Sequence, residues 1–217
     1  MLFRSIASAT LVDKKWQYEI VDGDSQLGGR TEGDVAFHLA ALSVGKKVHV
    51  LYDSVIAAPN KVVAQGDVRY ATRSSTSPND WQFTTLDLGR RESPIAGFGV
   101  ALSTDGEKLF AAWLGTSTAS PLKADRIRWM DVNDPQSLLE ERLSVAPKAP
   151  LAISPSSIIY GCEDRLCNFD LATRKSKLVS EESTANTTSI SWITWKKTSY
   201  ALANVSGKLS LLKQPGL

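Results

Sequence analysis

The sequence predicts an all-β protein in which similar antiparallel sheets follow one another along the chain. The first observation is an internal repeat: Leu2 to Asp22 recurs without a gap, 65 residues later, as Asp67 to Asp87. In both copies a Trp-Gln-aromatic triplet stands twelve residues after an Arg, and an aliphatic residue followed by Asp ends the segment. The second observation is a succession of short aliphatic and aromatic runs separated by Gly, Pro, Asn, Asp and Ser clusters, which is typical of strands and turns. Such a repeat indicates an array of similar sheets.

Five units are expected along the chain, approximately 1–33, 34–92, 93–148, 149–183 and 184–217. The second unit is the most complete, because clear turns separate its four strand-like runs. Helical tendency is confined to 134–142, where Pro135 limits it to one or two turns. The expected strands, in chain order, are 2–9, 15–22, 35–43, 47–53, 66–73, 81–88, 97–103, 108–114, 125–132, 140–146, 149–154, 157–161, 165–171, 175–181, 189–193, 199–205 and 208–212.

About seventeen strands, four to a complete unit, are the pattern expected of a β-propeller. The main alternative is a β-sandwich, which has about seven to nine strands and no internal repeat. We therefore expect a single β-propeller domain of which four to five blades are visible. Two arrangements stay open. Either the N-terminal pair of strands completes the blade begun by residues 189–212 and closes a small ring, or the chain is an open fragment of a larger propeller.

The second unit also resembles the blades of a known family. Val48 to Asp53, followed by Val68 to Arg73 and by Trp81, resembles blades of the sialidase-like (BNR-type) β-propellers. The resemblance is clear over 35–88, recognisable over 97–132 and faint beyond 149. Sialidase repeats carry an Asp box, Ser-x-Asp-x-Gly with an aromatic residue three positions on. The nearest segment here, Ser103 to Phe110, is one residue short, and we interpret it as an ordinary turn.

The resemblance raises the possibility of a glycoside hydrolase. Sialidases combine an arginine cluster for the substrate carboxylate with a Tyr nucleophile, a Glu partner and an Asp acid/base. Arg4, Arg69 and Arg128 recur at equivalent positions, and guanidinium groups suit carboxylate recognition. Each is expected on the third strand of its unit, away from the propeller axis, so the sequence favours pairing between blades. Tyr52 and Asp53 could be cast as catalytic, but this pair is generic to such blades.

Aromatic residues favour binding over catalysis. The tryptophans are distributed along the units, and aromatic faces can stack on sugar rings; packing within the sheets is the alternative for each of them. Trp192 and Trp195 stand an odd distance apart, so on one strand they point to opposite faces. The residues taken as ligand-binding candidates are Tyr52, Arg69, Tyr70, Trp113, Arg128 and Trp129.

Other chemistries find little support. His38 and His49 are the only histidines, and no metal-ligand spacing surrounds either one. No Gly-x-Ser-x-Gly elbow is present, and Gly97-Phe98-Gly99 lacks the third glycine of a dinucleotide loop. No cofactor is expected. A net charge of +2 without a basic stripe argues against nucleic-acid binding, and no apolar run approaches the ~20 residues of a membrane span.

Two pairs of residues bear on the cellular setting. Cys162 and Cys167 are spaced for a disulfide across a tight hairpin, although two free thiols are an equal alternative. Asn186 and Asn204 begin glycosylation sequons, a weak indication of an extracellular protein. The N-terminus does not read as a signal peptide. Because residue 2 already lies in a repeat unit, we expect a fragment of a longer protein, and the localisation stays open.

The sequence thus predicts a non-catalytic binding module, for either a glycan (lectin-like) or a protein partner. In a protein-interaction scaffold, the long loops 54–65 and 115–123 would carry the contacts. A glycoside hydrolase of the sialidase-like class is the alternative. The oligomeric state is open.

Overall fold

The computed structural model describes residues 5–23, 34–57, 64–88, 99–116, 123–179, 186–195 and 198–213. These residues form seventeen strands in five antiparallel sheets, with one short 3₁₀ turn, Pro135–Ser137. The first sheet is the hairpin β1 (Ile6–Val12) and β2 (Lys15–Asp22). The other sheets contain β3 (Asp34–Val44), β4 (Lys47–Ala57), β5 (Ala64–Ser74) and β6 (Gln82–Asp87); β7 (Val100–Thr104), β8 (Leu109–Gly115), β9 (Arg126–Asp131) and β10 (Leu139–Arg142); β11 (Pro147–Ile153), β12 (Ser157–Cys162), β13 (Arg165–Asp170) and β14 (Lys175–Leu178); and β15 (Thr187–Trp195), β16 (Thr198–Val205) and β17 (Lys208–Lys213).

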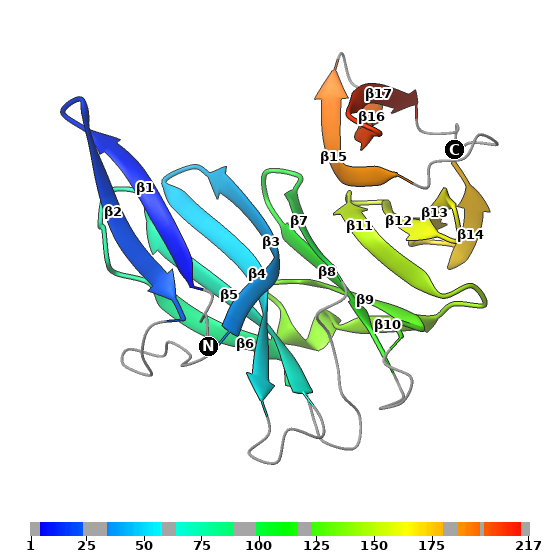
Figure 1. Ribbon diagram of the computed structural model, residues 1–217, viewed down its shortest axis with the longest axis horizontal. Helices are drawn as coiled ribbons and strands as arrows, with labels where there is room; N and C mark the ends of the chain where they lie inside the picture. The colour runs from blue at the N-terminus through cyan, green and yellow to red at the C-terminus, as the bar shows by residue number, and fades with distance from the viewer. Residues whose placement is uncertain are drawn as a thin grey trace.

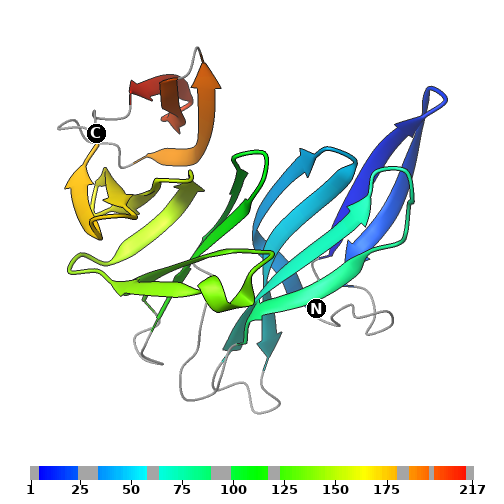
Figure 2. The same cartoon turned by 180° about the vertical axis from the view of Figure 1, so that it is seen from behind.

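The sheets stand one after another along an arc, and the first strands of the last four sheets lie innermost (Figure 1, Figure 2). Strand β3 packs against β7, β7 against β11, and β11 against β15. Sheets packed face to face around a shared axis are the arrangement of a β-propeller, so the predicted all-β propeller is confirmed. Within the described residues, no helix is long and apolar enough to cross a membrane.

A single 3₁₀ turn, Pro135–Ser137, forms within 134–142 and agrees with the expected limit of one or two turns. Asp134 caps this turn by accepting a hydrogen bond from the Gln136 backbone N–H. One strand needs correction. The outermost strand expected over 140–146 is the shorter β10, which ends at Arg142.

Apolar side chains of successive sheets pack against each other in four clusters, one at each of the four contacts between the described sheets. Side chains alternate along each strand, so one face of a sheet serves the contact before it and the other face the contact after it. The first cluster joins Ile6 and Val21 to Val50, Ala71 and Trp81. The clusters at the following contacts are built around Leu51 and Leu109, around Ile127 and Phe169, and around Ile159 and Ala203.

The repeated Asp is positioned by a β-bulge that both copies share. Val21 in β2 and Leu86 in β6 are extra residues in their ladders, placed directly before Asp22 and Asp87. A bulge shifts the alternation of side chains by one residue. Both aspartates therefore point toward the next sheet, where they are buried.

The repeat aligns Arg4 with Arg69, but the strand ladders place Ala7, not Arg4, at the position of Arg69. Ala7 faces Ile20 at the place where Arg69 faces Thr85. The reason is turn length: two residues link β1 to β2, whereas seven link β5 to β6. A gapless alignment of the sequence hides this difference. Arg4, the expected counterpart of Arg69, lies outside the described residues.

The two ends of the arc do not share a sheet. The hairpin β1–β2 and the three-stranded sheet β15–β17 are separate, and they stand at opposite ends of the arc in Figure 1. Among the described strands, the N-terminal pair thus does not complete the blade begun by β15.

Candidate functional site

The ligand-binding candidates Tyr52 and Arg69 lie at the contact between sheets β1–β2 and β3–β6. The Tyr52 hydroxyl donates to Asp22 Oδ2 at 2.5 Å, and Arg69 Nη1 lies 3.3 Å from the same oxygen. Tyr52 and Asp22 are fully buried. Burial raises the pKa of Tyr52 well above its ordinary value, and the charge of Asp22 adds to this effect. Tyr52 is thus held as a neutral hydrogen-bond donor within the contact.

The candidates Trp113 and Arg128 repeat this arrangement one sheet later. Trp113 Nε1 donates to Asp87 Oδ2 at 2.7 Å, and Arg128 Nη1 lies 2.6 Å from the same oxygen. Arg128 also pairs with Glu140 on the neighbouring strand. Trp113 faces Arg128 across its ladder, as Tyr52 faces Arg69. An aromatic donor and an Arg therefore bind one buried Asp at two successive contacts, and we call each set an aspartate clamp.

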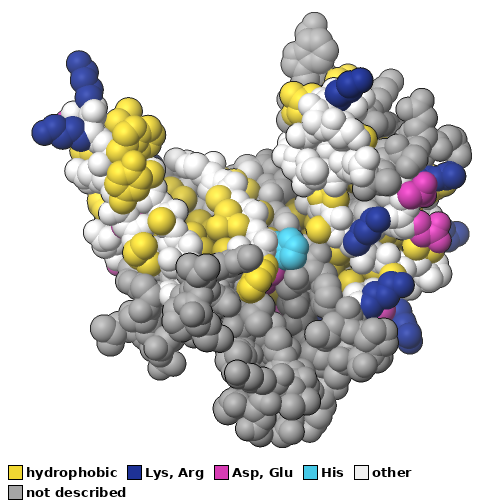
Figure 3. Space-filling model, viewed as in Figure 1, with side chains coloured by type: hydrophobic (Ala, Val, Ile, Leu, Met, Phe, Trp, Pro, Cys, Tyr) yellow, Lys and Arg dark blue, Asp and Glu magenta, His cyan; other side chains and the backbone are white. Residues whose placement is uncertain are grey.

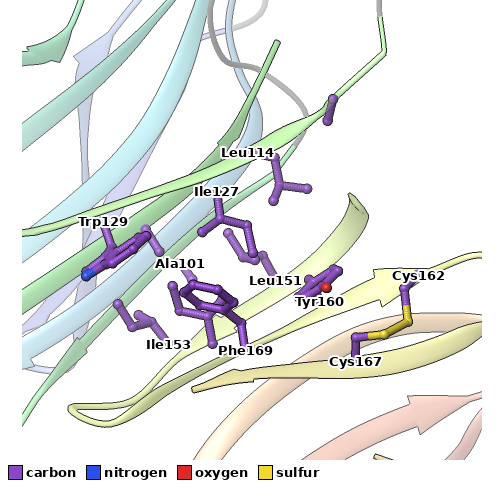
Figure 4. Close-up of a cluster of buried hydrophobic side chains, with 13 residues drawn as sticks. Ala101, Leu114, Ile127, Trp129, Leu151, Ile153, Tyr160, Cys162, Cys167 and Phe169 are labelled. Carbon is purple, nitrogen blue, oxygen red and sulfur yellow. A yellow bond between two sulfur atoms is a disulfide. The ribbon is translucent and has the colours of Figure 1, made fainter. Parts of the chain in front are cut away.

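The third contact uses different chemistry at the same ladder positions. Tyr160 and Cys167 face each other where the two clamps have an aromatic residue and Arg. The Tyr160 hydroxyl donates to Ser176 within its own sheet, and Cys167 is disulfide-bonded to Cys162. Both cysteines border the apolar cluster that contains Trp129 and Phe169 (Figure 4). A cross-linked apolar core replaces the clamp here.

The remaining predicted residues also have partners in the sheets. The Tyr70 hydroxyl oxygen lies 2.5 Å from Nδ1 of the buried His49. Trp129 packs edge-on against Phe169 with ring centroids 5.4 Å apart, and the Arg174 guanidinium lies 6.0 Å from its ring.

The possible glycosylation residues lie near the turns of the last sheet. Asn186 is exposed, whereas Asn204 is half-buried with a buried Oδ1. The parts of the two long loops over 58–63 and 117–122, expected to carry protein contacts, lie outside the described residues.

Two neighbouring cavities, which share several lining residues, lie among the innermost strands of the arc. One of 460 Å³ is lined by residues from all four innermost strands, among them Leu39, Leu102, Ala152 and Trp192. The other, of 260 Å³, lies at the N-terminal ends of the same strands and shares Leu39 with the first. Figure 3 shows the face of the molecule hollowed between the two ends of the arc. Four sheets converge at these two cavities, which we call the axial cavities.

Breaks in the strand pairing occur at one level of the innermost strands and border the smaller cavity, which we call the mouth of the axial cavities. Residues 36–38 bulge out of the ladder in β3, Ala149 and Pro150 do so in β11, and Thr188 does so in β15. Gly99, with φ at +146°, precedes β7 at the same level. Members of each irregular segment line the smaller cavity. Bulges of this kind re-aim side chains and often border binding sites.

Among the described residues that line the smaller cavity, His38 carries the ionisable side chain. The Asp53 carboxylate accepts a hydrogen bond from the His38 backbone N–H at 2.8 Å and lies 2.8 Å from the ring nitrogen Nδ1. Asp53 is fully buried, whereas the side chain of His38 is 34% exposed. Since a carboxylate accepts, Nδ1 carries the proton and Nε2 is the remaining polar atom of the ring. The bulge at Ala36, with φ at +60°, brings His38 into this position.

The rest of the lining is hydroxyl-bearing and apolar. Ser103, Ser189 and Ser191 border the larger cavity beside Trp192. The indole N–H of Trp192 has no hydrogen-bond partner among the described residues. No described lining residue of either axial cavity is acidic, and no group of three potential metal ligands occurs among the described residues.

Sequence reasoning did not select His38 as a site residue. None of the six ligand-binding candidates lines either axial cavity. The bulge in β3 brings His38 beside Asp53. Residues 35–43 carry no sequence pattern that predicts this bulge, so His38 could not be selected from the sequence.

A larger depression of 570 Å³ lies between sheets β7–β10 and β11–β14. It is lined by Lys123, Lys148 and Glu163, which are all exposed. Only two sheets contribute to it, and its charges are of both signs.

No protein-family model matches this chain, and no curated protein matches it in sequence. Among solved structures it is similar to a mutant of Trypanosoma rangeli sialidase displaying trans-sialidase activity, with 9% sequence identity and a TM-score of 0.44. The likeness covers 77% of this chain and 33% of the sialidase, so the chain spans a third of that protein's length. The description of this chain as a β-propeller follows from its own sheets.

Proposed function

We propose that this protein is a non-catalytic carbohydrate-binding module whose ligand enters the axial cavities beside His38. The observation that carries the proposal is the convergence at the cavity mouth. Irregular segments of four innermost strands border one space, and an imidazole held by a buried carboxylate faces it. Concave sites with a few oriented polar groups are the usual ligand sites of proteins.

The lining suits a sugar. Hydroxyls of Ser103, Ser189 and Ser191 can both donate and accept, as can the hydroxyls of a sugar. Trp192 borders the larger cavity, and its half-buried ring packs against the cluster that contains Ile159 and Ala203, so it adds apolar surface at the edge of the cavity. His38 Nε2 adds one directed polar contact, because Asp53 fixes the orientation of its ring.

The alternative, a glycoside hydrolase of the sialidase-like class, has less support. Sialidases are an exception among glycoside hydrolases, because a Tyr nucleophile replaces one of the two carboxyl groups, while an Asp acid/base still has to face the substrate. The nearest carboxylate, Asp53, is fully buried and accepts two hydrogen bonds from His38. Arg69 and Arg128, the candidates for a substrate carboxylate, are paired with Asp22 and Asp87 instead. Tyr52, the candidate nucleophile, donates to Asp22.

A glycan array followed by calorimetric titration of the best ligand tests the proposal. We expect His38→Ala to weaken binding about tenfold, the loss expected for one directed polar contact of about 1.4 kcal/mol. Lys108→Ala, in the exposed turn after β7, is the matched control and should bind as the wild type does.

Three results would contradict the proposal. The first is an array without binding to any glycan. The second is binding that is unchanged in His38→Ala while that variant unfolds at the wild-type urea concentration. The third is turnover of a fluorogenic sialoside, which would favour the hydrolase instead.

A further inference from the structure

Sheets in the arc always meet in one way. The trailing face of a sheet, which points toward the next sheet in the chain, covers the leading face of that next sheet. Two such faces have no covering sheet among the described residues. They are the leading face of β1–β2, at one end of the arc, and the trailing face of β15–β17, at the other end.

The open leading face of β1–β2 is apolar. Leu11, Trp16 and Tyr18 lie on it and are 56%, 61% and 76% exposed. Their neighbours Thr10 and Glu19 lie on the opposite face, where both contact Arg73 of the next sheet. Hydrophobic side chains accordingly form a visible patch on the arm made by β1 and β2 (Figure 3). Exposed apolar patches of this kind mark contact surfaces.

The internal repeat indicates what covers such a face. Trp16 and Tyr18 stand 65 residues before Trp81 and Phe83. In that second copy Trp81 is only 5% exposed, because it is packed in the cluster that includes Val21 of the preceding sheet, and Phe83 packs against the same cluster. The equivalent aromatic residues are thus covered by the trailing face of another sheet.

A trailing face is open at the other end of the arc. Ala201 and Ala203 of β16 pack toward Leu166 in the sheet before. Leu209 and Leu211 face the intervening positions of β16 across the ladder, so they point the opposite way. They are 73% and 54% exposed.

We propose that the leading face of β1–β2 binds the trailing face of β15–β17 in a second copy of this chain, head to tail. The two faces are of the two kinds that meet at each contact within the arc. Contact within one copy would require the arc to bend at sheet contacts that the Asp22 and Asp87 clamps and packed cores hold. A second copy supplies the missing face without changing any of those contacts. Because the contact is heterologous, two copies can close a ring with two such junctions.

Sedimentation equilibrium over a range of concentrations tests for the assembly. We expect the wild type to shift from monomer toward dimer as its concentration rises. A leading-face variant, Trp16→Ser with Tyr18→Ser, and a trailing-face variant, Leu209→Ser with Leu211→Ser, should each remain monomeric. All four positions are exposed, so both variants should fold, and far-UV circular dichroism checks this.

Mixing the two variants distinguishes head-to-tail contact from other forms of association. Each variant keeps the face that the other has lost, so an equimolar mixture should form a 1:1 complex with a single junction. Leu139→Ser is the matched control, because Leu139 is 43% exposed on β10, away from both ends of the arc, and its dimerisation should equal that of the wild type.

A wild type that is monomeric at all concentrations would overturn the proposal. So would a dimer that persists in either variant, or a mixture of the two variants that stays monomeric. The inference does not depend on carbohydrate binding, because none of the substituted residues lines the axial cavities.

Discussion

Asp87 and Arg128 join two neighbouring sheets through an ion pair of 2.6 Å. They come from β6 and β9, and 41 residues separate them in the chain. Trp113 donates to the same carboxylate oxygen, and one sheet earlier Asp22 receives the equivalent contacts from Tyr52 and Arg69. A repeated polar clamp therefore joins the sheets at the first two contacts of the propeller, beside their apolar clusters.

Replacement of Asp87 by Ala should lower the free energy of unfolding by roughly 3 kcal/mol, because it leaves Arg128 and the Trp113 N–H largely buried without their shared acceptor. Urea unfolding measures the loss. Glu140→Gln is the matched control, since Glu140 also pairs with Arg128 but its side chain is 38% exposed; its cost should be within about 1 kcal/mol. Equal costs for the two variants would contradict a structural role for the clamp.

Replacement of Tyr52 by Phe removes only the hydroxyl that donates to Asp22. We expect a loss of about 1–2 kcal/mol, because the bond is buried and its acceptor is charged. Tyr160→Phe is the matched comparison: it lies at the same ladder position, but its hydroxyl bonds the neutral Ser176. A smaller loss is expected there, of about 1 kcal/mol or less. The order of the two losses, measured by urea unfolding, decides whether the charge of Asp22 matters.

A residue pattern can indicate the role of an arginine on a strand without identifying its partner. The position of Arg69 and Arg128 on the third strand of their units, away from the propeller axis, indicated pairing between blades. Their partners could not be identified, since the bulges that turn Asp22 and Asp87 toward the next sheet leave no mark in the sequence. His38 could not be predicted as a site residue either, because the bulge that places it beside Asp53 leaves no mark in the sequence.

Residue pattern also failed where the length of a turn changed. The gapless repeat aligned Arg4 with Arg69, whereas the shorter turn after β1 places Ala7 opposite Ile20 instead. A contiguous alignment carries no information about how two strands are paired across a turn. The ladder itself is needed to decide which residues are equivalent.

Protonation of His49 should make the free energy of unfolding depend on pH. Burial, with a smaller effect of the Lys47 charge, lowers the pKa of His49 below 6.5 in the folded protein. The unfolded state therefore binds the proton more readily, and stability should fall as the pH drops below about 6.5, until the lower folded-state pKa is reached. Above that range the histidine is neutral in both states and contributes no slope.

Urea unfolding of the wild type and of His49→Gln, at a series of pH values from neutral to mildly acidic, measures this dependence. The variant should be less stable at neutral pH, because it loses the contact with Tyr70, but its stability should change less with pH. Parallel curves for the two proteins would show that His49 does not cause the acid sensitivity.

Loss of the disulfide should weaken one sheet contact without disturbing the clamps. Cys162 and Cys167 are five residues apart and border the core between sheets β7–β10 and β11–β14. Cross-linking so short a segment constrains the unfolded chain modestly, so Cys162→Ser with Cys167→Ser should cost about 2 kcal/mol for the lost link, plus the burial of two hydroxyls. Cys162→Ala with Cys167→Ala avoids those hydroxyls and should cost less. A serine pair that is as stable as the wild type in urea would show that the cross-link adds nothing to the apolar core around Phe169.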